Sequence, residues 1–170
     1  MSTLSEDFPF KTMAEVQEYL RSLKGNVPDD LYEAVEFVLG MRPNDGTSRP
    51  LLLNGETTYI DSYIAPLVEE LNRRDIRTLA SCSGLKEEHP EGIYRPSQGY
   101  LSILYSDMLF RYLGETIGHF PGLFVEVGEA YFEKSVSIRL VADDDITLKG
   151  LWSVVQQALS EYVMSSDIGV

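Results

Sequence analysis

The chain lacks the cysteines and the long apolar runs of secreted and membrane proteins. Cys82 is its only cysteine, so no intramolecular disulfide can form. No apolar run approaches the roughly 18 residues that a membrane span requires. The N-terminal residues show no basic region leading into an apolar stretch, as a signal peptide would. We therefore expect a cytoplasmic protein that does not enter a membrane.

Positive charge is also scarce. The chain carries 14 Lys and Arg against 27 Asp and Glu, a formal net charge of −13. Nucleic-acid-binding proteins usually hold phosphates with clustered Lys and Arg. The one dense basic stretch, Arg73, Arg74 and Arg77, is typical of a helix C-terminus, where positive charge suits the helix dipole. We therefore expect that nucleic acid does not bind tightly.

The remaining composition is typical of a globular α/β (α+β) protein. Apolar residues make up 44% of the 170 residues and are spread along the chain. A domain near this length buries roughly 68–70% of its unfolded surface, which is enough for a core. Helical and strand-like patterns alternate, so we expect a mixed sheet covered by helices. Residues 1–49 are expected to form a helical segment packed on a core of residues 50–170, as one domain overall.

Helices are predicted where apolar residues recur at three- and four-residue spacing. Thr12 and Glu15 match a capping box ahead of the first helix, and Pro28 opens a second. Asp61 is a candidate cap for the next helix. Pro66 would remove one of that helix's internal hydrogen bonds, so the helix alternatively starts near Ala65. Two further helices are expected, over residues 107–117 and from a cap at residue 147.

Strands are predicted over residues 51–53, 76–80, 100–105, 123–127 and 136–141, the last two joined as a hairpin. Between the second and third strands, residues 85–99 show no clear periodicity. Loops of this length in a compact domain tend to be lids, binding loops or disordered segments. We expect this loop to act as a flap over the end of the second strand.

The turn Ser81-Cys82-Ser83-Gly84 is the chemically suggestive segment of the chain. Small hydroxyl residues and a glycine after a strand offer backbone N–H groups and side-chain donors to a carboxylate, a phosphate or a polar cofactor edge. Cys82 also fits a small buried core residue. Asp61 joins the candidate ligand-binding residues if it faces the strand ends, and Tyr94 and Arg95 join them if the loop covers a ligand.

Cys82 would need a nearby base to act as a nucleophile. The only histidines are His89 and His119, and His89 lies close enough in the chain to swing toward Cys82. The spacing of Cys82, His89 and His119 matches no familiar zinc pattern, so no metal site is expected. The charged neighbours in the loop are largely glutamates. We therefore expect Cys82 to be structural or ligand-lining, with catalytic residues unknown.

A family resemblance is carried by Tyr59-Ile60-Asp61-Ser62, by Ile64-Ala65-Pro66-Leu67 with Asn72, and by Ser81-Cys82-Ser83-Gly84. This stretch, about residues 55–105, resembles the wybutosine-synthesis methyltransferase family, which acts on a modified guanosine of phenylalanine tRNA. The same turn also occurs in small uncharacterised microbial proteins. The resemblance implies an α/β fold other than the common Rossmann type and S-adenosylmethionine as cofactor. It assigns Asp61 and residues 81–84 to the site.

Three hypotheses follow for the function. The first is a protein with the fold of that family that binds a small polar ligand at the Ser81–Gly84 turn. The second is an S-adenosylmethionine-dependent methyltransferase of a nucleoside or tRNA. The third is a non-catalytic interaction module that uses an apolar patch on the helices across residues 12–41. A homo-oligomer is compatible with each of them.

Overall fold

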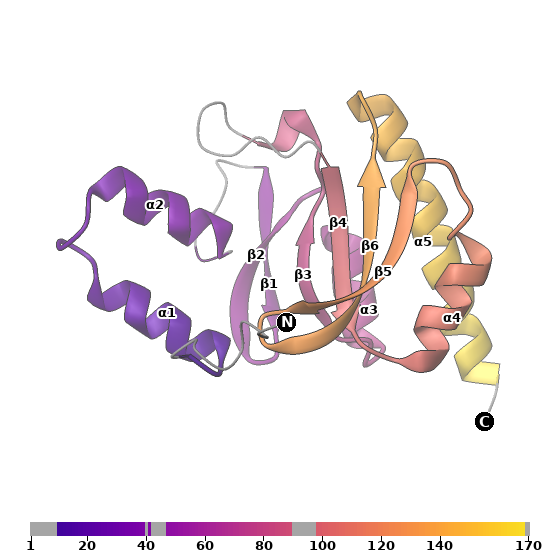
Figure 1. Ribbon diagram of the computed structural model, residues 1–170, viewed down its shortest axis with the longest axis horizontal. Coiled ribbons are helices and arrows are strands. Elements are labelled where there is room, and N and C mark those ends of the chain that lie inside the picture. The colour runs from indigo at the N-terminus through magenta and orange to yellow at the C-terminus, as the bar shows by residue number, and fades with distance from the viewer. Residues whose placement is uncertain (1–9, 40, 42–46, 90–97, 169–170) are drawn as a thin grey trace, which may run out of the picture.

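The computed structural model describes residues 10–39, 41, 47–89 and 98–168 (Figure 1). Helices and strands follow one another along the described chain and confirm the α+β class. The elements, in chain order, are α1 (Met13–Ser22), α2 (Asp29–Val38), β1 (Ser48–Leu53), β2 (Glu56–Asp61), α3 (Ala65–Arg73), β3 (Thr78–Cys82), the short 3₁₀ helix η1 (Lys86–Glu88), β4 (Gln98–Leu104), α4 (Asp107–Thr116), β5 (Leu123–Ala130), β6 (Glu133–Val141) and α5 (Asp145–Ile168).

The strands form two antiparallel sheets. β1 and β2 make a two-stranded sheet, and the other four strands are ordered β3-β4-β6-β5. Every pair among the described strands is antiparallel, which corrects the expected mixed sheet. Two of these pairs are joined by two-residue turns, and such short connections allow only antiparallel pairing. The expected β5–β6 hairpin is confirmed, and β3 pairs with β4.

Both hairpins turn through two residues with positive φ. These residues are Asn54 and Gly55 between β1 and β2, and Tyr131 and Phe132 between β5 and β6. Two consecutive positive φ angles are the mark of a type I′ turn, whose twist matches that of the flanking strands. Strand β2 was not predicted. Asp61, the candidate helix cap, is instead the last residue of that strand.

Helix α3 begins at Ala65, the later of the two predicted starts. Pro66 then lies in the first turn of the helix, where the missing N–H breaks no internal hydrogen bond. The start of α5 differs from the prediction. The Asp144 side chain accepts a hydrogen bond from the Thr147 backbone N–H at 2.7 Å, so Thr147 lies inside the helix. No helix in the described part of the chain is long and apolar enough to cross a membrane.

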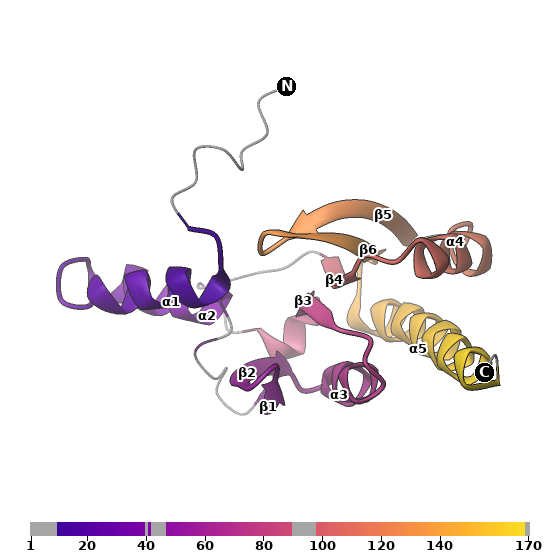
Figure 2. The ribbon, with the colours of Figure 1, turned by 90° about the horizontal axis from the view of Figure 1, so that it is seen from below.

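The core lies against one face of the four-stranded sheet. Leu101 and Ile103 of β4 alternate with residues of the other face, as do Val136, Ile138 and Leu140 of β6, and all five are at most 1% exposed. Helices α3, α4 and α5 complete this core, and Figure 2 shows α3 and α5 on the same side of the sheet. Trp152 of α5 is fully buried there.

Helices α1 and α2 lie together at one end of the molecule, beside the β1–β2 hairpin (Figure 1). Leu20 and Tyr32 are buried, but neither belongs to the main core cluster. Strand β1 begins at Ser48, so the segment predicted as helical, residues 1–49, already includes the start of a strand. The packing of this segment on the core stays a prediction.

Replacing Leu101 with alanine should strongly destabilise the protein. Its side chain is fully buried in the centre of β4, so truncation leaves a cavity, and we expect a loss of about 2–5 kcal/mol in the free energy of unfolding. The matched control is Leu52→Ala, because Leu52 is a strand leucine that is 75% exposed. Urea unfolding of both variants measures the difference. Equal losses would contradict this placement of the core.

Candidate functional site

Three chemically different side chains meet where two strands and one 3₁₀ helix end. Asp61 is the last residue of β2, Cys82 is the last residue of β3, and His89 follows η1. His89 Nε2 lies 3.4 Å from Cys82 Sγ and 3.4 Å from Asp61 Oδ2. The three donor atoms lie within 4.8 Å of one another. We call this group the Asp61–Cys82–His89 cluster.

The backbone orients two members of the cluster. Ser83 N–H donates to Asp61 Oδ2 at 2.7 Å, which ties the end of β2 to the end of β3. His89 Nδ1 lies 2.6 Å from the Leu85 carbonyl oxygen. A carbonyl oxygen only accepts hydrogen bonds, so Nδ1 carries a hydrogen and Nε2 is the atom presented to Cys82 and Asp61.

The cluster is almost closed to solvent. Cys82 is 5% exposed, and the side chains of His89 and Asp61 are 3% and 13% exposed. Burial lowers the pKa of His89, but hydrogen bonds to Asp61, Cys82 and the Leu85 carbonyl outweigh it and raise that pKa to about 10. The arrangement of a carboxylate and a sulfur around Nε2 therefore favours positive charge at its centre.

The turn after β3 is engaged inside the fold. Ser83 is fully buried, its carbonyl oxygen accepts a hydrogen bond from Trp152 Nε1 at 2.8 Å, and its hydroxyl accepts one from Leu85 N–H at 3.2 Å. Gly84 has φ of 74°, and a Cβ atom there would lie 2.4 Å from the Gly99 nitrogen. The turn predicted to offer backbone groups to a ligand thus uses these groups to hold the cluster in place.

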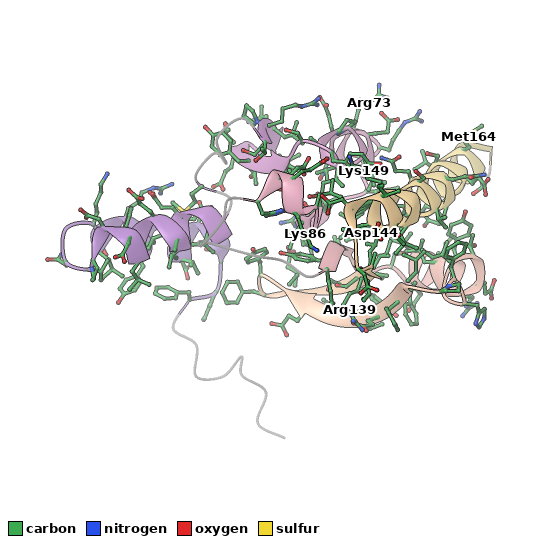
Figure 3. The ribbon with its side chains drawn as sticks, turned by 90° about the horizontal axis from the view of Figure 1, so that it is seen from above. Arg73, Lys86, Arg139, Asp144, Lys149 and Met164 are labelled. Atoms are coloured by element: carbon green, nitrogen blue, oxygen red, sulfur yellow. The ribbon has the colours of Figure 1, made fainter. Side chains whose placement is uncertain are left out.

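The segment after the turn is fastened to the start of α5. Asp145 accepts hydrogen bonds from the backbone N–H groups of Lys86 and Glu87, at 2.9 and 3.2 Å. Lys149 pairs with Glu87 at 2.7 Å, and Figure 3 shows Lys86 close to Asp144 and Lys149. Residues 85–89 are therefore packed, in contrast to the expected flap. Residues 90–97 of the predicted flap, with Tyr94 and Arg95, lie outside the described residues, and residues 98–99 begin β4.

Glu88 adds a second buried carboxyl group beside the cluster. Its Oε1 accepts a hydrogen bond from Tyr63 N–H at 2.6 Å, and the residue is 7% exposed. Burial raises the pKa of this carboxyl, although hydrogen bonds from Ser83 and Tyr63 oppose the rise. Glu88 thus links η1 to the turn and to the segment between β2 and α3. Sequence reasoning noted it only as loop charge, because its partners are more than twenty residues away in the chain or within the turn.

A cavity of about 480 Å³ lies beside β2 and β3, and Ile60 is among its lining residues. Ser81 lines it, whereas none of the three cluster residues does. It lies among residues of α1, β2, β3 and the β5–β6 turn, with Tyr100 from β4. Its lining includes hydroxyl and aromatic groups, namely Thr58, Tyr59, Thr78, Ser81, Tyr100 and Tyr131.

The structure divides the predicted site residues into separate groups. Asp61 and Cys82 lie together, and Ser83 N–H donates to Asp61. His89 lies beside Cys82, the position considered for a base that would activate the thiol. His119 is exposed after α4 and takes no part. Ser81 belongs to the cavity instead. Asp61 was the hardest residue to place from sequence, because its role depends on a strand that was not predicted.

Replacing Gly84 with alanine should destabilise the protein more than the same change at Gly55. Both glycines have positive φ, 74° and 83°, which costs alanine about 1–2 kcal/mol in the free energy of unfolding. Only at Gly84 would the added Cβ also meet backbone atoms of the neighbouring strand, which adds about 1–3 kcal/mol. Urea unfolding of the two variants tests this. A Gly84→Ala loss no larger than the Gly55→Ala loss would show that the turn is loosely packed.

Comparison of the chain with protein-family models, with curated proteins and with solved structures found no match. The resemblance to the wybutosine-synthesis methyltransferase family therefore stays a prediction carried by its motifs alone. The function has to be argued from the cluster and the cavity.

Proposed function

We propose that this protein binds a small polar ligand in the cavity beside Ser81, at the open edge of β3. The observation that carries the proposal is the cavity itself. Its volume of about 480 Å³ falls within the range of roughly 300–1,000 Å³ that is usual for ligand pockets. The Ser83 and Gly84 part of the predicted turn is buried, so Ser81 is the turn residue through which a ligand would be contacted.

The lining favours a ligand that combines a flat ring with hydroxyl groups. Tyr59 and Tyr100 supply aromatic faces, and Ser81 and Thr58 supply hydroxyls that can donate or accept hydrogen bonds. A nucleoside has both features. The family resemblance independently implies S-adenosylmethionine, which contains adenosine, so that compound is the first to test. We further propose that the protein has the fold of that family and that it is cytoplasmic, the location that its single cysteine suggests.

Methyl transfer is a second candidate, supported by the same resemblance. For this activity, S-adenosylmethionine would occupy the cavity and a nucleoside or tRNA would supply the acceptor. The distribution of charge favours a small acceptor. Arg73 and Arg74 both pair with Glu70, and Arg77 pairs with Glu133, so these cations are already partly neutralised.

The interaction-module hypothesis has a weaker observation behind it. Tyr19 of α1 and Leu31 of α2 are 50% and 53% exposed. Among the described side chains of α1 and α2, these two are the large apolar ones that are exposed. A partner surface or a homo-oligomer would use this end of the molecule, and gel filtration of the wild type beside Leu31→Glu would reveal it.

Ligand binding is tested by adding S-adenosylmethionine, adenosine and ATP separately and measuring thermal stabilisation and calorimetric affinity. We expect saturable binding of at least one adenosine-containing compound. Ser81→Leu should weaken it at least about tenfold, because the larger side chain intrudes on the cavity. Ser153→Leu, at an exposed serine of α5, is the matched control and should bind like the wild type. Identical affinities for both variants would remove the cavity from the proposal.

Unmodified tRNA should bind weakly. With a net charge of −13, the chain repels the phosphate backbone, and Arg73, Arg74 and Arg77 already pair with glutamates. We expect a dissociation constant weaker than about 1 µM at about 0.15 M salt in a filter-binding assay. Submicromolar binding that falls steeply with added salt would overturn this expectation and favour the tRNA methyltransferase.

A further inference from the structure

We infer that Asp61, Cys82 and His89 bind one divalent transition-metal ion, and that zinc is the metal they match best. The three residues supply one carboxylate oxygen, one sulfur and one imidazole nitrogen, the ligand classes found in protein zinc sites. They come from three separate segments of the chain, yet their donor atoms converge. No other group of this kind occurs among the residues that the structure describes.

The two separations from His89 Nε2 fit a tetrahedral ion. With usual zinc–ligand bond lengths, a tetrahedron places nitrogen and oxygen about 3.3–3.5 Å apart and nitrogen and sulfur about 3.5–3.6 Å apart. The observed separations are 3.4 Å from His89 Nε2 to Asp61 Oδ2 and 3.4 Å from His89 Nε2 to Cys82 Sγ. The third separation, from Cys82 Sγ to the Asp61 carboxylate, is at most 4.8 Å, against about 3.6 Å around a tetrahedral zinc ion.

The same distances suit a hydrogen-bonded triad less well. A charge-assisted N–H···O bond is usually about 2.7–2.9 Å long, and the Nε2 to Oδ2 separation is 3.4 Å. Nε2 has one hydrogen at most, yet two acceptors face it. In a Cys–His–Asp relay the carboxylate orients the second ring nitrogen, whereas here the Leu85 carbonyl holds that nitrogen. The arrangement thus resembles ligands around a centre more than a proton relay.

The surroundings are those of a prepared metal site. Metal-binding histidines commonly donate their second N–H to a backbone carbonyl or a carboxylate, which fixes the ring. His89 does so to Leu85. Asp61 Oδ2 likewise accepts a hydrogen bond from Ser83 N–H, and the Ser83 carbonyl oxygen accepts one from the Trp152 indole, which holds the Ser83 backbone in place. Two of the three ligands, His89 and Asp61, are therefore oriented before any ion arrives.

The ligand set indicates the metal and its coordination. A thiolate and an imidazole select zinc or a similar transition metal over magnesium and calcium, which prefer oxygen ligands. Three protein ligands leave one position of a tetrahedron for water or another group, as in catalytic rather than structural zinc sites. None of the three residues lines the cavity beside Ser81, so this inference stands whether or not the cavity binds a ligand.

The test uses the full chain without a histidine tag, stripped of metal by a chelator. Zn²⁺ is titrated in competition with a chromophoric chelator, and Co²⁺ is titrated while its absorption spectrum is recorded. We expect one ion per chain, a sulfur-to-cobalt charge-transfer band and the intense visible bands of tetrahedral cobalt. Asp61→Asn, Cys82→Ser and His89→Gln should each weaken zinc binding by more than about 100-fold, because loss of an outer-sphere partner alone costs about 10–100-fold.

The matched control is His119→Gln, which removes the other histidine from an exposed position and should leave zinc binding unchanged. Circular dichroism checks that each variant is folded. A second measurement, on the wild type, does not depend on whether the variants fold. Zn²⁺ should slow alkylation of Cys82 at least about tenfold, and Mg²⁺ should not. Absence of stoichiometric binding, a cobalt spectrum without the sulfur band, unprotected Cys82, or equal losses in His119→Gln and His89→Gln would overturn the inference.

Discussion

The rest of the site depends on the backbone of Ser83. Its N–H binds Asp61 and its carbonyl binds the indole of Trp152, so one residue connects the β1–β2 hairpin, the end of β3 and α5. Ser83 and Trp152 are fully buried, and a buried polar group without a partner would cost free energy. These bonds therefore require the hairpin, the sheet and the helix to assume one relative position, and the cluster forms where they meet.

The cluster and the cavity share elements but remain separate. In β3, Ser81 lines the cavity and the next residue, Cys82, belongs to the cluster. In β2, Ile60 lines the cavity and the next residue, Asp61, belongs to the cluster. Successive side chains of a strand point to opposite faces, so a step of one residue is enough to pass from one site to the other. An ion at the cluster and a ligand in the cavity would thus sit on a common backbone, and each would stiffen the strand ends that form the other site.

The sequence predicted most elements but only part of the site. Strong local signals identified α1, α4, β4 and the β5–β6 hairpin, because their apolar spacing and turn residues act within a few positions. Strand β2 was missed because Asp61 before a helix has the pattern of a cap, and only the pairing with β1 reveals a strand. The turn residues Cys82 and Ser83 were predicted as site candidates, and the structure places them at and beside the cluster, while their role in a site stays a prediction. The bonds from Trp152 and Asp145 to the turn had no local signal, since their partners lie 69 and about 58 positions away.

That separation in the chain has a consequence for how the protein is made. The cluster residues lie between positions 61 and 89, so all three leave the ribosome well before Trp152, and domains fold as units once their segments have emerged. Until α5 is synthesised and docks, the carbonyl of Ser83 lacks its indole partner and the turn is free to move. The cluster residues thus become a fixed set of ligands only late in biosynthesis, so completion of α5 acts as the checkpoint for their assembly.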